Sequence, residues 1–122
     1  MSWTTAELDR FAREEEAQVI AYRADGTGHR PVTVWVVAAR GAVYLRSVYG
    51  EQGRWYQRVR RHPDGGFVLG GTEFPVHFEP VDDADVQSAV DDAYRGKYAR
   101  YSELPSVLSP TATATTLRLD PR

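Results

Sequence analysis

The most constraining feature of the sequence is a pair of apolar segments that only two residues separate. The first is Val32-Thr-Val-Trp-Val-Val-Ala-Ala39, and the second begins at Ala42 as Ala-Val-Tyr-Leu. β-Branched and aromatic residues favour strands, and a two-residue connection joins antiparallel neighbours. Arg40-Gly41 therefore predicts a tight turn inside a β-hairpin, and any fold for this chain has to contain an antiparallel sheet.

Four other segments have strand character and bring the expected number of strands to about six. Residues 73–81 alternate apolar Phe74, Val76 and Phe78 with polar neighbours, as in a strand with one buried face. Asp25-Gly, Gly65-Gly and Gly70-Gly supply turns between segments. The other three expected strands are residues 17–23, 67–69 and 112–119.

Two longer segments are predicted as the main helices. Residues 4–16 begin with a capping box, in which Thr4 and Glu7 satisfy each other's backbone N–H groups. Residues 84–101 follow Asp82-Asp83, where either carboxylate can cap the first turn. Apolar residues recur at helical spacing in both segments, so each helix has one side to pack against a sheet.

Smaller features complete the expected order of elements. Residues 54–61 are predicted as a short helix that ends before Pro63, and residues 102–110 as a loop. Within the second main helix, Asp91 and Arg95 are four residues apart and are expected to form an ion pair on the helix surface.

The order of elements predicts an α+β fold. Consecutive strands with tight turns favour a mostly antiparallel sheet that curls into a small barrel, with the two main helices packed outside. The chain has 122 residues and an ordinary globular composition, 42% hydrophobic and 26% charged, and no repeat or low-complexity segment divides it. We therefore expect one domain over residues 1–122.

Several classes of function are excluded by residue type and spacing. The chain has no cysteine, which excludes disulfides, thiolate metal sites and cysteine nucleophiles. Its three histidines show no metal-ligand spacing, and no serine lies in a nucleophile elbow, so we expect no metal site. The sequence lacks an apolar run of roughly 20 residues and a signal peptide, which predicts a cytoplasmic protein without a membrane span.

Charge is distributed unevenly along the chain. Between Arg23 and Arg61 eight arginines face only two acids, a local charge of +6, whereas residues 73–103 hold eight acids against three bases, a local charge of −5. The central segment could bind an anion, or the two segments could neutralise each other in the fold. A net charge of −2 argues against a nucleic-acid partner.

The segment from residue 42 to residue 61 combines the residue types that an anionic, flat ligand requires. Arg46 and Ser47 lie at the end of the predicted strand, and the backbone N–H groups of a helix open after Gly53, so these groups together could hold a phosphate. Arginine and aromatic side chains follow, which could contact phosphate oxygens and a planar ring system. They are Arg54, Trp55, Tyr56 and Arg58. The alternative is that the aromatics are core residues and the arginines are solvated.

Five motifs, taken in their order and spacing, resemble an uncharacterised bacterial family, domain of unknown function 2255. The motifs are Val32-Thr-Val-Trp-Val-Val, Val43-Tyr-Leu-Arg-Ser, Gly53-Arg-Trp-Tyr-Gln-Arg, Asp91-Asp-Ala-Tyr-Arg-Gly-Lys-Tyr and Ala114-Thr-Thr-Leu-Arg-Leu-Asp-Pro-Arg. That family looks like a branch of the flavin-binding split β-barrels, akin to pyridoxamine-phosphate oxidases and deazaflavin-dependent nitroreductases. The resemblance implies a split barrel, a homodimer, and an FMN or deazaflavin (F420-like) cofactor near the subunit interface.

The resemblance also implies which residues bind the cofactor. Arg46 and Ser47 would anchor its phosphate, and Lys97 in the helix motif is a further candidate. The implied function is a flavin- or deazaflavin-dependent oxidoreductase. The alternative is a binding or interaction module that has kept the barrel without a cofactor. The sequence does not decide between FMN and the deazaflavin, and it names no substrate or catalytic residue.

Overall fold

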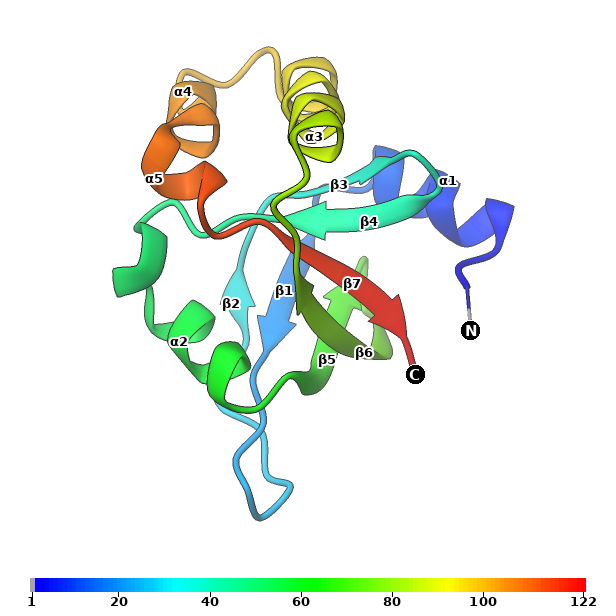
Figure 1. Ribbon diagram of the computed structural model, residues 1–122. Helices are drawn as coiled ribbons and strands as arrows, with labels where there is room; N and C mark the ends of the chain where they lie inside the picture. The colour runs from blue at the N-terminus through cyan, green and yellow to red at the C-terminus, as the bar shows by residue number, and fades with distance from the viewer. Residues whose placement is uncertain (1) are drawn as a thin grey trace.

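A seven-stranded antiparallel sheet forms the body of the molecule in the computed structural model, which describes residues 2–122 (Figure 1). The strands are β1 (Ala17–Ile20), β2 (Val32–Thr33), β3 (Val36–Ala39), β4 (Ala42–Leu45), β5 (Asp64–Leu69), β6 (Thr72–Pro80) and β7 (Leu117–Pro121). Their order across the sheet is β2-β1-β5-β6-β7-β4-β3, and every neighbouring pair is antiparallel. The predicted α+β class and the mostly antiparallel curled sheet are confirmed.

The two edge strands of this sheet are consecutive in the chain, and this makes the sheet curl. β2 pairs with β1 and β3 pairs with β4, while Val34 between them donates a backbone hydrogen bond to Ala17 (3.0 Å). The prediction of one continuous strand over residues 32–39 was wrong, and the count is seven strands rather than six. A straight strand cannot serve both edges, so the chain breaks its pairing at Val34-Trp35.

The tight turns predicted at Arg40-Gly41 and Gly70-Gly71 are confirmed, whereas the turn predicted at Gly65-Gly66 was wrong, because both glycines pair with β6 inside β5. Arg40 and Gly41 both have positive φ, 51° and 76°, and so do Gly70 and Gly71, at 52° and 85°. Positive φ at both central residues is the mark of a type I′ hairpin turn, whose twist matches that of the flanking strands. Arg40 accepts this conformation although it has a Cβ atom.

Within the described residues 2–122, five helices and a short 3₁₀ turn surround the sheet. The helices are α1 (Thr5–Arg13), α2 (Arg54–Arg61), α3 (Ala84–Lys97), α4 (Leu104–Leu108) and α5 (Pro110–Thr113), and the 3₁₀ turn is η1 (Gly50–Gln52). α1 and α3 are the predicted main helices, capped by Thr4 and Asp83 as expected. The predicted loop over 102–110 was wrong, because Pro105 and Pro110 lie in the first turns of α4 and α5, where proline is compatible with a helix.

Two hydrophobic clusters lie on opposite faces of the sheet. The barrel interior contains Val43 and Leu45, whereas Tyr44 between them points to the outer face, against α3 and α4. In Figure 1, α3, α4 and α5 lie together above the barrel, α1 lies beside β3 and β4, and α2 lies on the other side near β2. No helix within the described residues 2–122 is both long and apolar enough to cross a membrane.

Candidate functional site

A surface groove runs between residues 30–35, which include β2, and the segment from the end of β4 to α2. It consists of two adjoining pockets that share Val32, Tyr49 and Trp55. We call them the apolar pocket, about 560 Å³, and the basic pocket, about 500 Å³. The bend at Val34-Trp35, where the chain closes the barrel, forms one wall, and the turn into α2 forms the other.

The apolar pocket is enclosed mainly by hydrophobic side chains. Its other residues come from β2, the bend, the end of β4 and helix α4, and they are Thr33, Val34, Trp35, Arg46, Val48, Glu103, Ser106 and Val107. Glu103 is the one acidic residue in this lining among the described residues. The pocket therefore suits a flat apolar ring better than a charged group.

The basic pocket lies at the first turn of α2. It contains Arg30, Arg54 and Arg58 and no acidic residue among the described side chains; the remaining lining residues are Pro31, Gln52 and Gly53. Gly53 is the N-cap of α2, and no described side chain caps the first-turn N–H groups. Three guanidinium groups and the positive end of a helix make this pocket suited to an anion.

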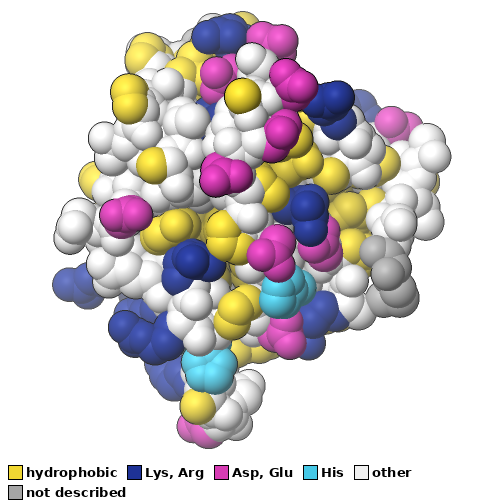
Figure 2. All heavy atoms as spheres, in the orientation of Figure 1, with side chains coloured by type: hydrophobic (Ala, Val, Ile, Leu, Met, Phe, Trp, Pro, Cys, Tyr) yellow, Lys and Arg dark blue, Asp and Glu magenta, His cyan; other side chains and the backbone are white. Residues whose placement is uncertain are grey.

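The positive field around the basic pocket extends beyond its lining. Figure 2 shows Lys and Arg side chains gathered on one side of the molecule, over the region of α2. Desolvation lowers the pKa of His29, and the nearby charges of Arg23 and Arg58 lower it further. Neighbouring cations thus add to desolvation in opposing the protonation of His29.

Exposed apolar side chains border both pockets. Val32, Val48 and Tyr49 are 36%, 44% and 77% exposed, and all three line the groove. Exposed apolar side chains gathered along one groove are typical of a site for a ligand or a second protein surface.

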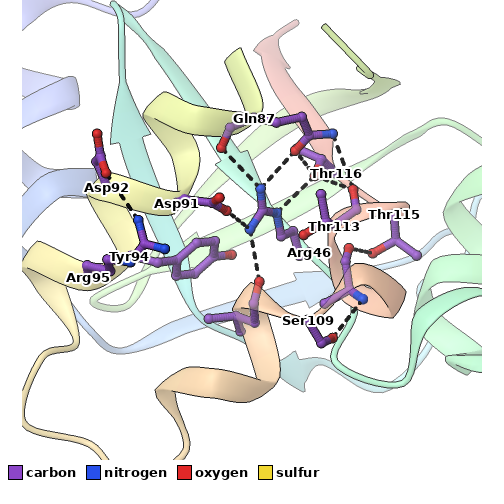
Figure 3. Close-up of polar contacts among 12 residues, drawn as sticks. Arg46, Gln87, Asp91, Asp92, Tyr94, Arg95, Ser109, Thr113, Thr115 and Thr116 are labelled. Carbon is purple, nitrogen blue, oxygen red and sulfur yellow. Dashed lines mark hydrogen bonds and ion pairs between the residues drawn. The ribbon is translucent and has the colours of Figure 1, made fainter. Parts of the chain in front are cut away.

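Arg46 does not present its guanidinium to the groove as a free donor. Its side chain is fully buried, and Figure 3 shows it between α3, α4 and the start of β7. It donates to Thr116 Oγ1 (2.9 Å), the Asp91 carboxylate (2.6 Å), the Val107 carbonyl (2.9 Å) and the Gln87 side-chain oxygen (2.8 Å), with a longer bond to the Gln87 carbonyl (3.4 Å). These bonds use all five N–H groups.

The partner of Arg46 corrects another expectation. Asp91 does not pair with Arg95, as its spacing on α3 suggested, but points toward the sheet and binds Arg46. Arg95 pairs instead with Asp92, at 3.2 Å on the exposed side of the helix. Arg46 is the stronger partner for Asp91 because its guanidinium is buried and needs a counter-ion.

Ser47 lies directly behind the first turn of α2. Its Oγ is buried and has no hydrogen-bond partner in the part of the chain that the structure describes. A Cβ atom on Gly53 would lie 2.3 Å from this oxygen, so any larger residue at position 53 would force the Ser47 hydroxyl to move. Ser47 supports the basic pocket without lining it.

Two other predicted residues lie away from the groove. Tyr56 belongs to the barrel core, with its ring edge-on to Trp55. The Lys97 ammonium donates to the carbonyls of Phe11 and Val36, both at 2.7 Å, and so joins α1 to β3. Burial lowers the pKa of Lys97 to about 8.

Of the seven predicted site residues, the structure brings three together in the basic pocket: Arg54, Trp55 and Arg58. Arg46 borders the apolar pocket. A role of any of them in binding a cofactor stays a prediction. Sequence reasoning missed Arg30, Trp35 and Glu103, and only the positive charge of the central segment pointed to Arg30.

Comparisons with known proteins agree with this architecture. A family model described as "Uncharacterized protein conserved in bacteria (DUF2255)" matches residues 7–119. A comparison with curated proteins finds no match.

Several solved structures resemble the chain. One is an F420 reductase, with 12% identity, a TM-score of 0.62, and coverage of 93% of this chain and 91% of that chain. Another is a putative pyridoxamine 5′-phosphate oxidase from Listeria innocua, with 11% identity, a TM-score of 0.61, and coverage of 94% and 88%. A third is a FAD-binding protein from Mesorhizobium loti, with 14% identity, a TM-score of 0.55, and coverage of 98% and 88%. At these identities the likeness shows a shared split-barrel fold.

Proposed function

The chain belongs to the DUF2255 family of uncharacterised bacterial proteins, and on that premise we propose that it binds FMN or an F420-type deazaflavin and acts as an oxidoreductase of the split-barrel type. The observation that carries the proposal is the division of the groove. An apolar pocket adjoins a pocket with three arginines and no acid among the described residues. A cofactor with a planar ring and a phosphate likewise has an apolar part and an anionic part side by side.

The residues present suit such a cofactor. Arg30, Arg54 and Arg58 would hold the phosphate, together with the first-turn N–H groups of α2. Trp55 lies where the two pockets meet, and Trp35 belongs to the apolar pocket, so both can contact a ring. When bound, the flavin or deazaflavin supplies hydride transfer, and the protein contributes anchoring and the exclusion of water.

The proposal includes a homodimer. Val32, Val48 and Tyr49 leave apolar area exposed along the groove, and a second copy of the chain could cover it. Covering the apolar pocket would remove water from the ring of a bound cofactor.

The test is a titration of the purified protein with FMN and with F420, followed by cofactor and tryptophan fluorescence. Replacing Arg54 or Arg58 by alanine removes a charge-assisted contact with phosphate, so each variant is expected to bind about tenfold more weakly. Arg60→Ala is the matched control, since Arg60 is exposed on the same helix and does not line the groove. Its affinity should stay close to that of the parent protein.

Two results would contradict the proposal in different ways. An equal loss in Arg60→Ala would mean that only the general charge of the helix matters. The absence of saturable binding of either cofactor, with a dimer still present by light scattering, would favour the cofactor-free interaction module.

A further inference from the structure

A cluster of aromatic rings leads from the groove to Tyr101 in the segment that follows α3. Trp35 borders the apolar pocket, and behind it Tyr98 stacks on the indole with centroids 4.3 Å apart and planes within 7°. Tyr101 also contacts the indole, at 5.3 Å. Rings this close exchange electrons readily, because the π systems nearly touch. One end of the cluster therefore borders the groove, and the other reaches the half-exposed Tyr101.

The tyrosines of this cluster differ in what accepts their phenol proton. Tyr94 donates to the Trp35 carbonyl (2.9 Å) and Tyr98 to the Val36 carbonyl (3.1 Å). Tyr101 donates to a carboxylate oxygen of Glu15 at 2.6 Å. An oxidised phenol is a strong acid at each of these positions, and a carboxylate is a far stronger base for its proton than a peptide carbonyl. Of these three, only Tyr101 can lose an electron and a proton together.

We propose that Trp35 and Tyr101 form a one-electron path between the groove and the protein surface. The Trp35 indole would give one electron to a one-electron oxidant bound in the groove, such as a photoexcited flavin, and that oxidant would be reduced by one electron. The indole regains its electron from the Tyr101 ring, and the Tyr101 proton passes to Glu15. The products are the acceptor reduced by one electron, a neutral tyrosyl radical at Tyr101 and a protonated Glu15 carboxyl group.

Cations lie beside two of the tyrosine rings and disfavour a positive charge on either ring. The Lys97 ammonium lies 5.2 Å from the Tyr98 ring centroid, and the Arg100 guanidinium lies 4.6 Å from that of Tyr101. Both cations oppose a positive charge on the ring beside them. Arg100 also donates to Glu15 (2.6 Å) and to the Tyr101 hydroxyl (2.9 Å). An oxidised ring is therefore stable only where the phenol becomes neutral by losing its proton, and of these three tyrosines only Tyr101 donates to a carboxylate.

This path goes beyond the proposed oxidoreductase function, and its test needs no cofactor. Azide radicals generated by pulse radiolysis oxidise tryptophan in the cofactor-free protein, and the absorbance of indolyl and tyrosyl radicals is then followed in time. We expect the indolyl radical to decay as the tyrosyl radical forms, at a rate independent of protein concentration. Failure to bind FMN or F420 leaves this result unaffected, so the two proposals fail separately.

Variants locate the path. Tyr101→Phe is expected to reduce the yield of tyrosyl radical to that of Trp35→Phe, which measures the background from Trp3 and Trp55. Tyr98→Phe is the matched control, since it removes a phenol from the other ring on Trp35 and should keep the yield. Glu15→Gln removes the proton acceptor and should slow the transfer about tenfold.

The proposal is overturned if Tyr101→Phe keeps the parent yield, if Trp35→Phe does, or if Tyr98→Phe loses the signal as fully as Tyr101→Phe. Circular dichroism checks that each variant is folded. Should Tyr98→Phe fail to fold, Tyr49→Phe replaces it as the control that must keep the yield, because Tyr49 is 77% exposed and forms no close pair with another described aromatic ring.

Discussion

Two adjacent aspartates on α3 offer a direct measurement of what burial adds to an ion pair. Asp91 binds Arg46 at 2.6 Å, with side-chain exposures of 29% and 0%, while Asp92 binds Arg95 at 3.2 Å, with exposures of 80% and 57%. Each aspartate has one arginine partner and a place in the same helix. Replacing each by alanine in turn therefore changes mainly the environment from which a carboxylate is removed.

The expected costs follow from that environment. Asp91→Ala leaves the Arg46 guanidinium buried and without a counter-ion, held only by hydrogen bonds to neutral oxygens. Breaking a buried pair in this way costs about 3–5 kcal/mol, and the partial exposure of Asp91 favours the lower end, about 3 kcal/mol. Asp92→Ala removes an exposed pair and should cost less than about 0.5 kcal/mol. The gain in helix propensity, about 0.5 kcal/mol, is common to both variants.

The assay is urea unfolding of the two variants and the parent at one pH and salt concentration. A loss of about 3 kcal/mol in a chain of this size also lowers Tm by roughly 10 °C. Equal free energies of unfolding for Asp91→Ala and Asp92→Ala would refute the reasoning, since they would mean that Arg46 tolerates burial without a carboxylate. A change in m-value for Asp91→Ala would show instead that the variant alters the compactness of the native or unfolded state.

Two further predictions concern positions near and far from the groove. Gly53→Ala places a methyl group 2.3 Å from Ser47 Oγ and should lower the free energy of unfolding by about 1–3 kcal/mol. Adding Ser47→Ala should restore part of this loss in denaturant unfolding, and a double variant without such recovery would show that the clash lies elsewhere. Lys97 is the only lysine of the chain, and burial lowers its pKa to about 8, so the folded protein releases this proton before the unfolded chain does. The free energy of unfolding should consequently rise with pH between about 8 and about 10.4, the pKa of an unperturbed lysine. An NMR titration of the Lys97 Cε chemical shift with a midpoint near that unperturbed pKa would contradict the prediction.

Local features of the fold were predictable from the sequence. The turns at Arg40-Gly41 and Gly70-Gly71 and the cap at Thr4 depend on residues only a few positions apart. Their geometry is decided by steric limits on φ and by the hydrogen bonds of a single helix turn. Long-range neighbours change these two turns and this cap little, whereas the predicted turn at Gly65-Gly66 was wrong because pairing with β6 keeps both glycines in β5.

Features that depend on distant contacts were not predictable in the same way. The segment 32–39 has continuous strand propensity, and only the need to pair with both β1 and β4 breaks it at Trp35. Asp91 has Arg95 at ideal helical spacing, yet Arg46, 45 residues away in sequence, is its partner. In both cases the tertiary contact outweighs the local preference, because it buries a group that the local arrangement would leave exposed or unpaired.

Tertiary contacts also decide which arginines suit an anion in the groove. Arg46 had the best position in the sequence, at the end of a strand, but a phosphate that binds it must replace hydrogen bonds that are already made inside a buried network. Arg30 and Arg54 are exposed and Arg58 is half-buried, so an anion displaces mainly water from them. The first exchange loses about as many charge-assisted bonds as it gains, whereas the second is a net gain. Recognition of phosphate should therefore depend on the side chains of the basic pocket, and Arg46 should contribute by holding α4 as one wall of the apolar pocket.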